Sequence, residues 1–229
     1  MKYRQLSWSR RETLGLLRGV VGSLTIGSCA RTKLIAQPPS RQGSFHPQTT
    51  SSAMPEAASP DLPQSLTAAL QNSRDPNSVL TALMPVVVKE LRCDRCFLFV
   101  RAPLQRLTRI THGYSRETRW PTMVQSTWSP ESQALNQKDP LTASAYRSSQ
   151  AHFIGDIESA PTGTLDLALE RSVFRHRALI HAPIYQGNVF YGILEPCVFE
   201  TPRIWTRRDR KITTELQERL GPWIVRYLQ

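Results

Sequence analysis

The chain contains no hydrophobic run long enough to cross a membrane. The stretch from Leu14 to Ser28 is modestly apolar, but Arg18 interrupts it. It is also shorter than the roughly 20 apolar residues that a membrane-spanning helix needs. We therefore expect no membrane span.

Acidic residues are scarce, because 18 Asp and Glu stand against 29 Lys and Arg, which gives a formal net charge of +11 at pH 7. Residues 1–53 account for +7 of this charge and contain a single acid, Glu12. The folded part therefore holds only +4, with acids interspersed, and we expect no nucleic-acid partner. The best remaining candidate for a nucleic-acid-binding surface is one basic block, which also reads as the solvated first turn of a helix. It comprises Arg203, Arg207, Arg208, Arg210 and Lys211.

Cysteine is rare, with four residues in the chain. Cys93 and Cys96 have the spacing of redox and zinc sites, but they open a predicted strand, on which residues three apart point to opposite faces. A zinc site would need Cys197 and a histidine such as His176 or His181 to join them, and no local spacing supports it. We predict buried thiols and no metal site. A redox sensor or enzyme that uses Cys93, Cys96 and Cys197 remains an alternative.

No catalytic constellation of nucleophile, base and acid emerges. His181 shares strand parity with Leu179, which favours a hydrogen-bonded structural histidine over a general base. Glu195 is an acid within an apolar strand, so a buried position would require a cationic partner, and we expect Arg177 to be that partner. We therefore predict that the protein is not an enzyme.

Residues 1–36 form a basic leader. Ser9–Leu14 resembles the twin-arginine export motif, and Ile26–Cys29 resembles a lipoprotein processing box in which Cys29 would be acylated. Thr13 and Arg18 count against export. Three interpretations stay open: an inert tail or an internal start at Met54, twin-arginine export, or another targeting peptide. The expected location is the cytoplasm, with export, as a lipoprotein if Cys29 is acylated, as the alternative.

Residues 37–63 are rich in Pro, Ser, Thr, Gln and Ala. Such a composition buries too little apolar surface to offset the entropy of ordering, so we predict a disordered linker. A single folded domain is expected over residues 64–229.

The first half of that domain reads as a helix and a hairpin. Asp75 and Pro76 form a helix-start signal, and apolar residues recur behind them at three- and four-residue spacing up to Leu91. Residues 94–101 and 106–114 read as paired strands. Periodicity then fades over residues 115–138, where Trp120 and Trp128 lie in a long loop, and such loops are usually functional or mobile.

The second half reads as alternating helices and strands. Helices are predicted at 140–149 and 164–173, and strands at 152–157, 177–185 and 189–199, the last two joined by a tight turn. Thr206 and Asp209 form a variant capping box for a terminal helix. Its apolar stripe is longer than one sheet face readily covers, so we expect a homodimer through the terminal helices. The stripe comprises Ile212, Leu216, Leu220, Ile224 and Leu228.

The apolar strand and Pro-Arg-x-Trp-Thr corner at residues 192–209, together with the strand at 93–101 and the order of elements, resemble a GAF domain over residues 64–228. The closest likeness is to the stand-alone GAF proteins of photosynthetic bacteria. The resemblance implies an α+β fold with a central antiparallel sheet of five to six strands, terminal helices on one face and a loop-covered pocket on the other. It implies a non-catalytic sensory or regulatory domain that binds a small molecule or an unknown protein partner. A structural interaction or assembly protein with a filled pocket is a further alternative.

Within that resemblance, the candidate ligand-binding residues are Trp120, Trp128, Phe153 and His181. Some bilin-binding GAF photoreceptors carry an Asp-x-Cys-Phe motif, and residues 94–97 have this form, but they lie at the wrong position in the domain. No cysteine lies between Cys96 and Cys197. We therefore expect no thioether-linked bilin and predict no cofactor.

Overall fold

The structure is a computed structural model that describes residues 62–229, except for the side chains of residues 134–136. The predicted leader (1–36) and nearly all of the predicted linker (37–63) lie outside the described residues. The same holds for Cys29 and the twin-arginine motif. The chain divides into two compact units between Pro55 and Glu56, and all described residues belong to the second.

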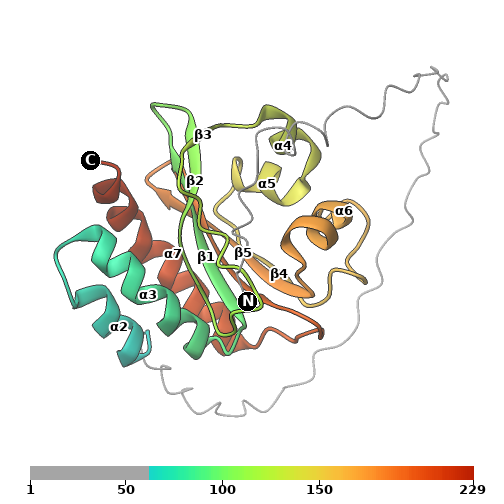
Figure 1. Cartoon of the computed structure of the whole chain (residues 1–229), viewed down its shortest axis with the longest axis horizontal. Coiled ribbons are helices and arrows are strands. Elements are labelled where there is room, and N and C mark those ends of the chain that lie inside the picture. The colour runs from blue at the N-terminus through green and yellow to red at the C-terminus, as the bar shows by residue number, and fades with distance from the viewer. Residues whose placement is uncertain (1–61) are drawn as a thin grey trace, which may run out of the picture. The chain divides into compact units, whose positions relative to one another are not determined.

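Six strands form one antiparallel sheet in the order β3-β2-β1-β6-β5-β4 (Figure 1). The hairpins β1–β2 and β5–β6 meet at its centre, where β1 pairs with β6. The predicted α+β class and strand number are confirmed. The strands are β1 (Arg95–Ala102), β2 (Leu107–Ser115), β3 (Ser129–Pro130), β4 (His152–Ile154), β5 (Ala178–Gln186) and β6 (Val189–Val198).

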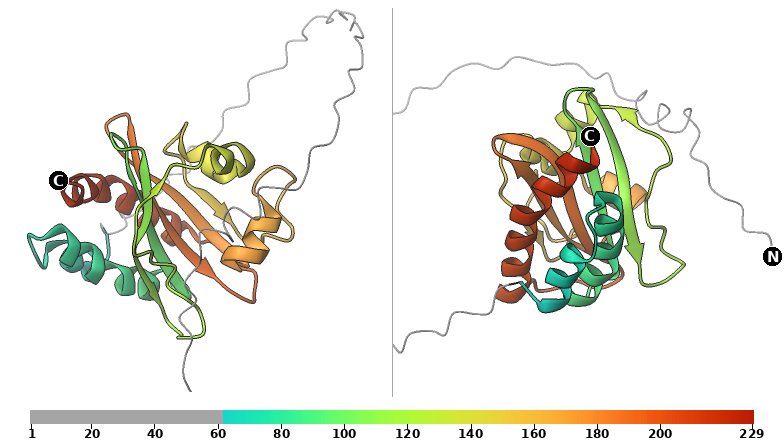
Figure 2. Two further views of the ribbon diagram at one scale, coloured as in Figure 1. Left: turned by 45° about the horizontal axis from the view of Figure 1, so that its top comes forward. Right: turned by 90° about the vertical axis from the view of Figure 1, so that its left-hand side faces the viewer.

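Helices cover the sheet on both faces. Figure 2 shows α2, α3 and α7 packed on one face, which we call the helix face, and α4, α5 and α6 over the other, which we call the loop face. Among residues 62–229 no helix combines the length and apolarity needed to cross a membrane. The helices are α2 (Gln64–Gln71), α3 (Pro76–Glu90), α4 (Gln133–Lys138), α5 (Pro140–Ala145), α6 (Leu167–Leu169), the π-helical turn η1 (Glu170–Phe174) and α7 (Arg207–Tyr227).

The two long helices begin where their capping residues predict. The Asp75 carboxylate accepts a hydrogen bond from the Ser78 amide at 2.7 Å, and Pro76 occupies the first turn of α3. At α7, the Thr206 hydroxyl accepts from the Asp209 amide at 3.1 Å, and the Asp209 carboxylate accepts from the Thr206 amide at 2.9 Å. This reciprocal pair satisfies amides that would otherwise lack partners at the helix start.

Three predicted elements are shorter in the structure, and one of them, the helix expected at 140–149, ends at Ala145. The strand expected to reach residue 157 ends at Ile154, because the chain leaves the sheet at Gly155, whose carbonyl accepts a hydrogen bond from the Arg203 amide at 2.7 Å. The helix expected at 164–173 is one α-helical turn capped by Asp166 and continued by η1. The turn η1 ends at Arg175 in the left-handed conformation, with φ of 59°.

The hydrophobic core lies on the helix face. Aliphatic side chains of β1, β5 and β6 pack against α2, α3 and α7, and burial of each large one contributes about 1.5–3 kcal/mol. This layer is the main source of the fold's stability. Its members include Leu66, Leu80, Leu83, Val87, Leu98, Val100, Ile180, Ile184, Leu194, Leu216, Leu220 and Ile224.

The apolar stripe of α7 is covered by the chain itself. Ile212 is 3 % exposed, and Leu216, Leu220 and Ile224 are 0 % exposed. The stripe was expected to exceed what one sheet face covers, and this reason for expecting a homodimer is wrong. Ile224 is a core residue, while Leu228 at the end of the stripe is half-buried.

Candidate functional site

The loop face carries buried charged side chains at its centre. On this face Arg95 of β1 stands opposite Cys197 of β6, and Glu195, two residues away on β6, stands opposite Phe97. Arg95 is 1 % exposed and Glu195 is 6 % exposed. Burial of such groups is costly unless each has partners. We call the buried group on this face the polar network, and it comprises Arg95, Glu170, His176, His181 and Glu195.

Arg95 is held by backbone carbonyls and by a histidine. Its Nη1 donates to the Pro121 carbonyl at 2.9 Å, and its Nη2 donates to the Phe174 carbonyl at 3.1 Å. Nη2 also lies 2.7 Å from Nε2 of His176. A guanidinium only donates, so this histidine nitrogen accepts. Arg95 thus ties the long loop and the η1 turn to the middle of the sheet.

His176 connects Arg95 to two carboxylates. With its Nε2 accepting, the proton of its ring lies on Nδ1, which stands 2.9 Å from Oε2 of Glu170 and 3.7 Å from Oε1 of Glu195. Glu170 reaches this position from η1, where it is 4 % exposed. The turn η1 and the strand β6 therefore each deliver one carboxylate to the same imidazole.

Glu195 is paired with His181. Nδ1 of His181 lies 2.8 Å from Oε2 of Glu195, and its Nε2 is buried without a hydrogen-bond partner within residues 62–229. The prediction that Arg177 pairs with Glu195 is wrong, because Nε of Arg177 lies 2.8 Å from Oδ1 of Asp156 instead. The register explains this difference, since the β5–β6 pairing sets His181 across from Glu195. Arg177 lies four residues further along, roughly 13 Å away on an extended chain.

The two buried carboxylates have pKa values shifted in opposite directions. Burial raises the pKa of Glu170, and the nearby His176 offsets only part of that effect. Burial also acts on Glu195, but the hydrogen bond from His181 and the positive charge of Arg95 hold the pKa of Glu195 below its usual value. The network thus keeps Glu195 as a buried carboxylate at neutral pH.

The three described cysteines do not form one site. Cys96 and Cys197 lie on neighbouring strands, but Cys96 belongs to the helix-face core and Cys197 packs on the loop face. Cys93, Cys96 and Cys197 are each 0 % exposed. Burial raises the pKa of the Cys93 and Cys96 thiols, which keeps them protonated.

The four predicted ligand-binding residues are dispersed. Trp120 stacks on Phe199, with ring centroids 4.0 Å apart, in a loop-face cluster. Trp128 packs against the helix-face core, with the Arg109 guanidinium over its ring. His181 is part of the polar network, and Phe153 lies at the β4 edge of the sheet. The long loop lacks periodicity, so the sequence could not place its two tryptophans in separate clusters.

A hollow of about 400 Å³ lies at the β4 edge. It is bounded by the segment that follows β4 and by the segment that precedes α7, and Phe153 is among its lining residues. Neither Trp120 nor Trp128 lines it. Of the four predicted residues, the structure therefore places only Phe153 at this hollow.

Arg95 and Glu170 are the network members that sequence reasoning missed. Arg95 is the first residue of β1 and precedes an apolar run, so the argument that singled out Glu195 can be extended to Arg95. Glu170 gives no comparable signal, because only the π-helical turn directs it inward. Within residues 62–229, no group of three or more Cys, His, Asp or Glu side chains could hold a metal ion.

No protein-family model matches the chain, and no curated protein matches it. Several solved structures do match this chain. A protein with bound biliverdin IXa, in its far-red absorbing dark state, has a TM-score of 0.56 and 16% identity over 70% of this chain and 97% of its own. The phycocyanobilin-bound GAF domain of a cyanobacterial phytochrome has a TM-score of 0.54 and 15% identity over 68% of this chain and 87% of its own.

A third similar structure is the GAF domain of a phosphoenolpyruvate-protein phosphotransferase from Acinetobacter. It has a TM-score of 0.53 and 11% identity, and the match covers 70% of this chain and 90% of that domain. At these identities the likeness concerns the fold. With its strand order and helix layers, residues 62–229 of this chain have the GAF fold.

Proposed function

We propose that this chain is a non-catalytic, GAF-type sensory or regulatory domain that acts by binding a protein partner. The observation that carries the proposal is the filled loop face. Where a ligand-binding domain would keep a pocket, side chains of this chain pack against one another: the polar network at the centre, and Trp120 on Phe199 beside it. A domain whose interior is occupied by its own residues acts through its surface.

Two of the similar domains bind bilins, and the residues of this chain do not fit such a group. A bilin on the loop face would need the space that Arg95, His176 and Glu195 fill, and none of these three is more than 6 % exposed. Among the described residues, Cys197 is the cysteine on this face, and it is 0 % exposed. We therefore propose neither a bilin nor another cofactor.

Native mass spectrometry of the protein purified from its own source tests this function. We expect a stoichiometric complex with a second protein, no added small-molecule mass and no visible absorption. A retained small molecule would contradict the proposal and favour the small-molecule sensor. The assembly-protein alternative is also supported by the filled face, and it predicts a complex whose affinity does not respond to any signal.

The cysteine-based alternative has a separate test. In a Cys29→Ser variant only Cys93, Cys96 and Cys197 remain, and all three are buried. We expect them to react with a thiol reagent only as fast as the domain unfolds. Rapid labelling of any one of them in the native protein would favour the redox sensor.

Oligomeric state and location are proposals as well. A homodimer through the terminal helices would have to use the half-buried Trp223, Tyr227 and Leu228, and light scattering at about 10–50 µM distinguishes it from a monomer.

We propose a cytoplasmic location, with twin-arginine export as the alternative. Fractionation of source cells that express Arg10→Lys with Arg11→Lys tests export, because loss of exported protein would support it.

A further inference from the structure

The hollow at the β4 edge has a preformed wall. The Arg203 amide donates to the Gly155 carbonyl at 2.7 Å, and the indole N–H of Trp205 donates to the Ile154 carbonyl at 2.9 Å. A Cβ at position 155 would stand 2.7 Å from the Arg203 carbonyl oxygen, so glycine allows the two segments to approach. These contacts fix the hollow before any partner arrives.

The lining of the hollow is largely apolar. Phe153, Ala160, Pro161, Pro202 and Ile204 all contribute to it. Ile204 is 88 % exposed, whereas Trp205 beside it is 5 % exposed. The two prolines offer no backbone N–H groups. A volume of about 400 Å³ lies within the range of binding pockets and accommodates a large apolar side chain of a peptide.

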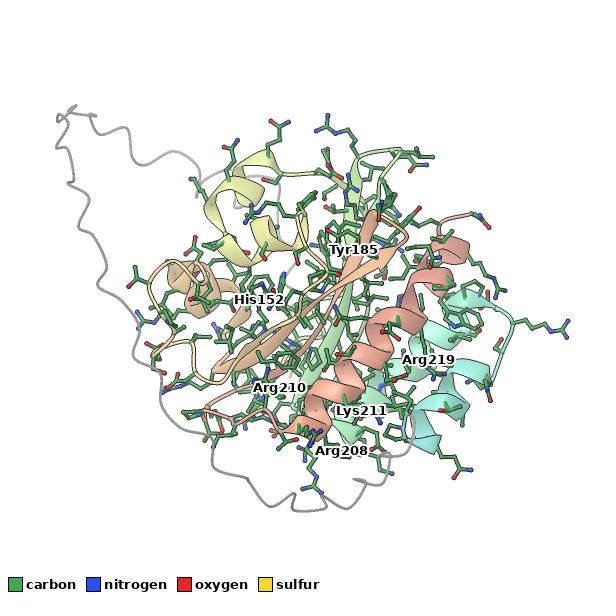
Figure 3. All side chains as sticks on the ribbon, turned by 180° about the vertical axis from the view of Figure 1, so that it is seen from behind. His152, Tyr185, Arg208, Arg210, Lys211 and Arg219 are labelled. Carbon is green, nitrogen blue, oxygen red and sulfur yellow. The ribbon has the colours of Figure 1, made fainter. Side chains whose placement is uncertain are left out.

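Basic residues gather beside this apolar hollow. Residues 200–211 contain five Lys and Arg and two acids, and one of these acids, Asp209, is the buried cap of α7. Figure 3 shows Arg208, Arg210 and Lys211 around the start of α7. The Arg210 guanidinium lies 4.2 Å from the centre of the Phe153 ring, which joins the charge to the lining. The acid in the lining, Asp156, is already paired with Arg177.

We propose that this surface, formed by Phe153, Pro202, Ile204 and Arg210, binds an acidic peptide segment of a protein partner that carries one large apolar residue. The apolar residue enters the hollow beside Ile204, and a flanking carboxylate pairs with Arg210. The proposal rests on the proposed function, since it identifies the surface through which the domain acts. An apolar hollow among the charges favours a peptide over nucleic acid, which would need an extended basic stripe.

The probe is a fluorescein-labelled peptide of Asp and Glu residues with one central Leu, whose binding to the full chain is followed by anisotropy. We expect micromolar affinity that falls with salt, and weaker binding when Leu is replaced by Ser in the peptide. Ile204→Ser should weaken binding about fivefold or more. Its matched control is Leu104→Ser, because Leu104 is 94 % exposed in a distant hairpin.

A second pair of variants tests the charge. Arg210→Glu should weaken binding about tenfold, whereas Arg219→Glu, the same change further along α7 in Figure 3, should leave it unchanged. Thermal unfolding confirms that each variant is folded. Equal effects within either pair, or tighter binding of oligothymidine than of the peptide, would overturn the proposal. A protein complex in native mass spectrometry that survives Ile204→Ser and Arg210→Glu would overturn this surface and leave the proposed function intact.

Discussion

The two faces of the sheet use the same strands and stabilise the fold by different means. On the helix face, Leu98, Ile180 and Leu194 pack against helices and need only matched shape. On the loop face, Arg95 and Glu195 are equally buried but depend on specific partners. An apolar layer tolerates adjustment, whereas a buried charge without its partner costs several kcal/mol. Stability on the loop face therefore depends on individual residue pairs. The helix face depends on apolar packing and is the main source of stability.

The largest effect on stability is expected from a charge placed in the apolar core of the helix face. Ile224→Asp introduces a carboxylate at a position that is 0 % exposed and surrounded by aliphatic side chains. The free-energy cost of burying this carboxylate is comparable to the whole free energy of unfolding of an ordinary domain. We therefore expect circular dichroism to show an unfolded protein. A folded monomer would show that this part of α7 is not core.

Next in size is the removal of a charge that belongs on the loop face. Glu195→Ala removes the carboxylate that lies 2.8 Å from His181 and 3.7 Å from His176, and we expect a loss of about 3–5 kcal/mol in the free energy of unfolding, measured with urea. Glu195→Gln, which can still accept a hydrogen bond, is the matched control and should lose less. Equal stability of the alanine variant and the wild type would contradict the contrast between the faces.

A cavity on the helix face should have a somewhat smaller effect. Leu216→Ala removes a side chain that is 0 % exposed, and we expect a loss of about 3 kcal/mol. Unlike Glu195→Ala, this variant should show the same loss at pH 5 and pH 8, because no titratable partner is left behind. A pH-dependent loss would mean that the two layers are coupled.

The smallest effect concerns His112, whose Nε2 lies 3.1 Å from Oδ1 of Asn77 in α3. Burial, aided by Arg109, lowers its pKa to about 4 from a usual value of 6.5. The unfolded chain therefore takes up a proton first, and stability falls as the pH drops from 6.5 towards 4. Replacement of His112 by Asn should make the unfolding midpoint fall less over this range, and the remaining fall includes that from His152, whose pKa burial also lowers. The loss of stability that comes from protonation of Glu195 should begin only below the usual glutamate pKa of 4.5.

Sequence reasoning could predict the elements that local chemistry determines. The caps at Asp75 and at Thr206 with Asp209 were predicted from residue type and spacing alone, and the structure confirms both. The pairing of Arg177 was wrong, because choosing a partner for Glu195 requires the register between two strands. The network is completed by Glu170 from a π-helical turn, and no local pattern signals such a turn. The hollow likewise arises from two segments almost fifty residues apart.

The pairing of His181 with Glu195 also restricts how the protein can evolve. The two residues face each other across adjacent strands and share one short contact. Loss of either alone leaves the other buried and unmatched, so a lineage has to pass through a weakened intermediate or exchange both together. Descendants of this chain should therefore inherit the two positions as a pair, while exposed positions such as Leu104 drift freely.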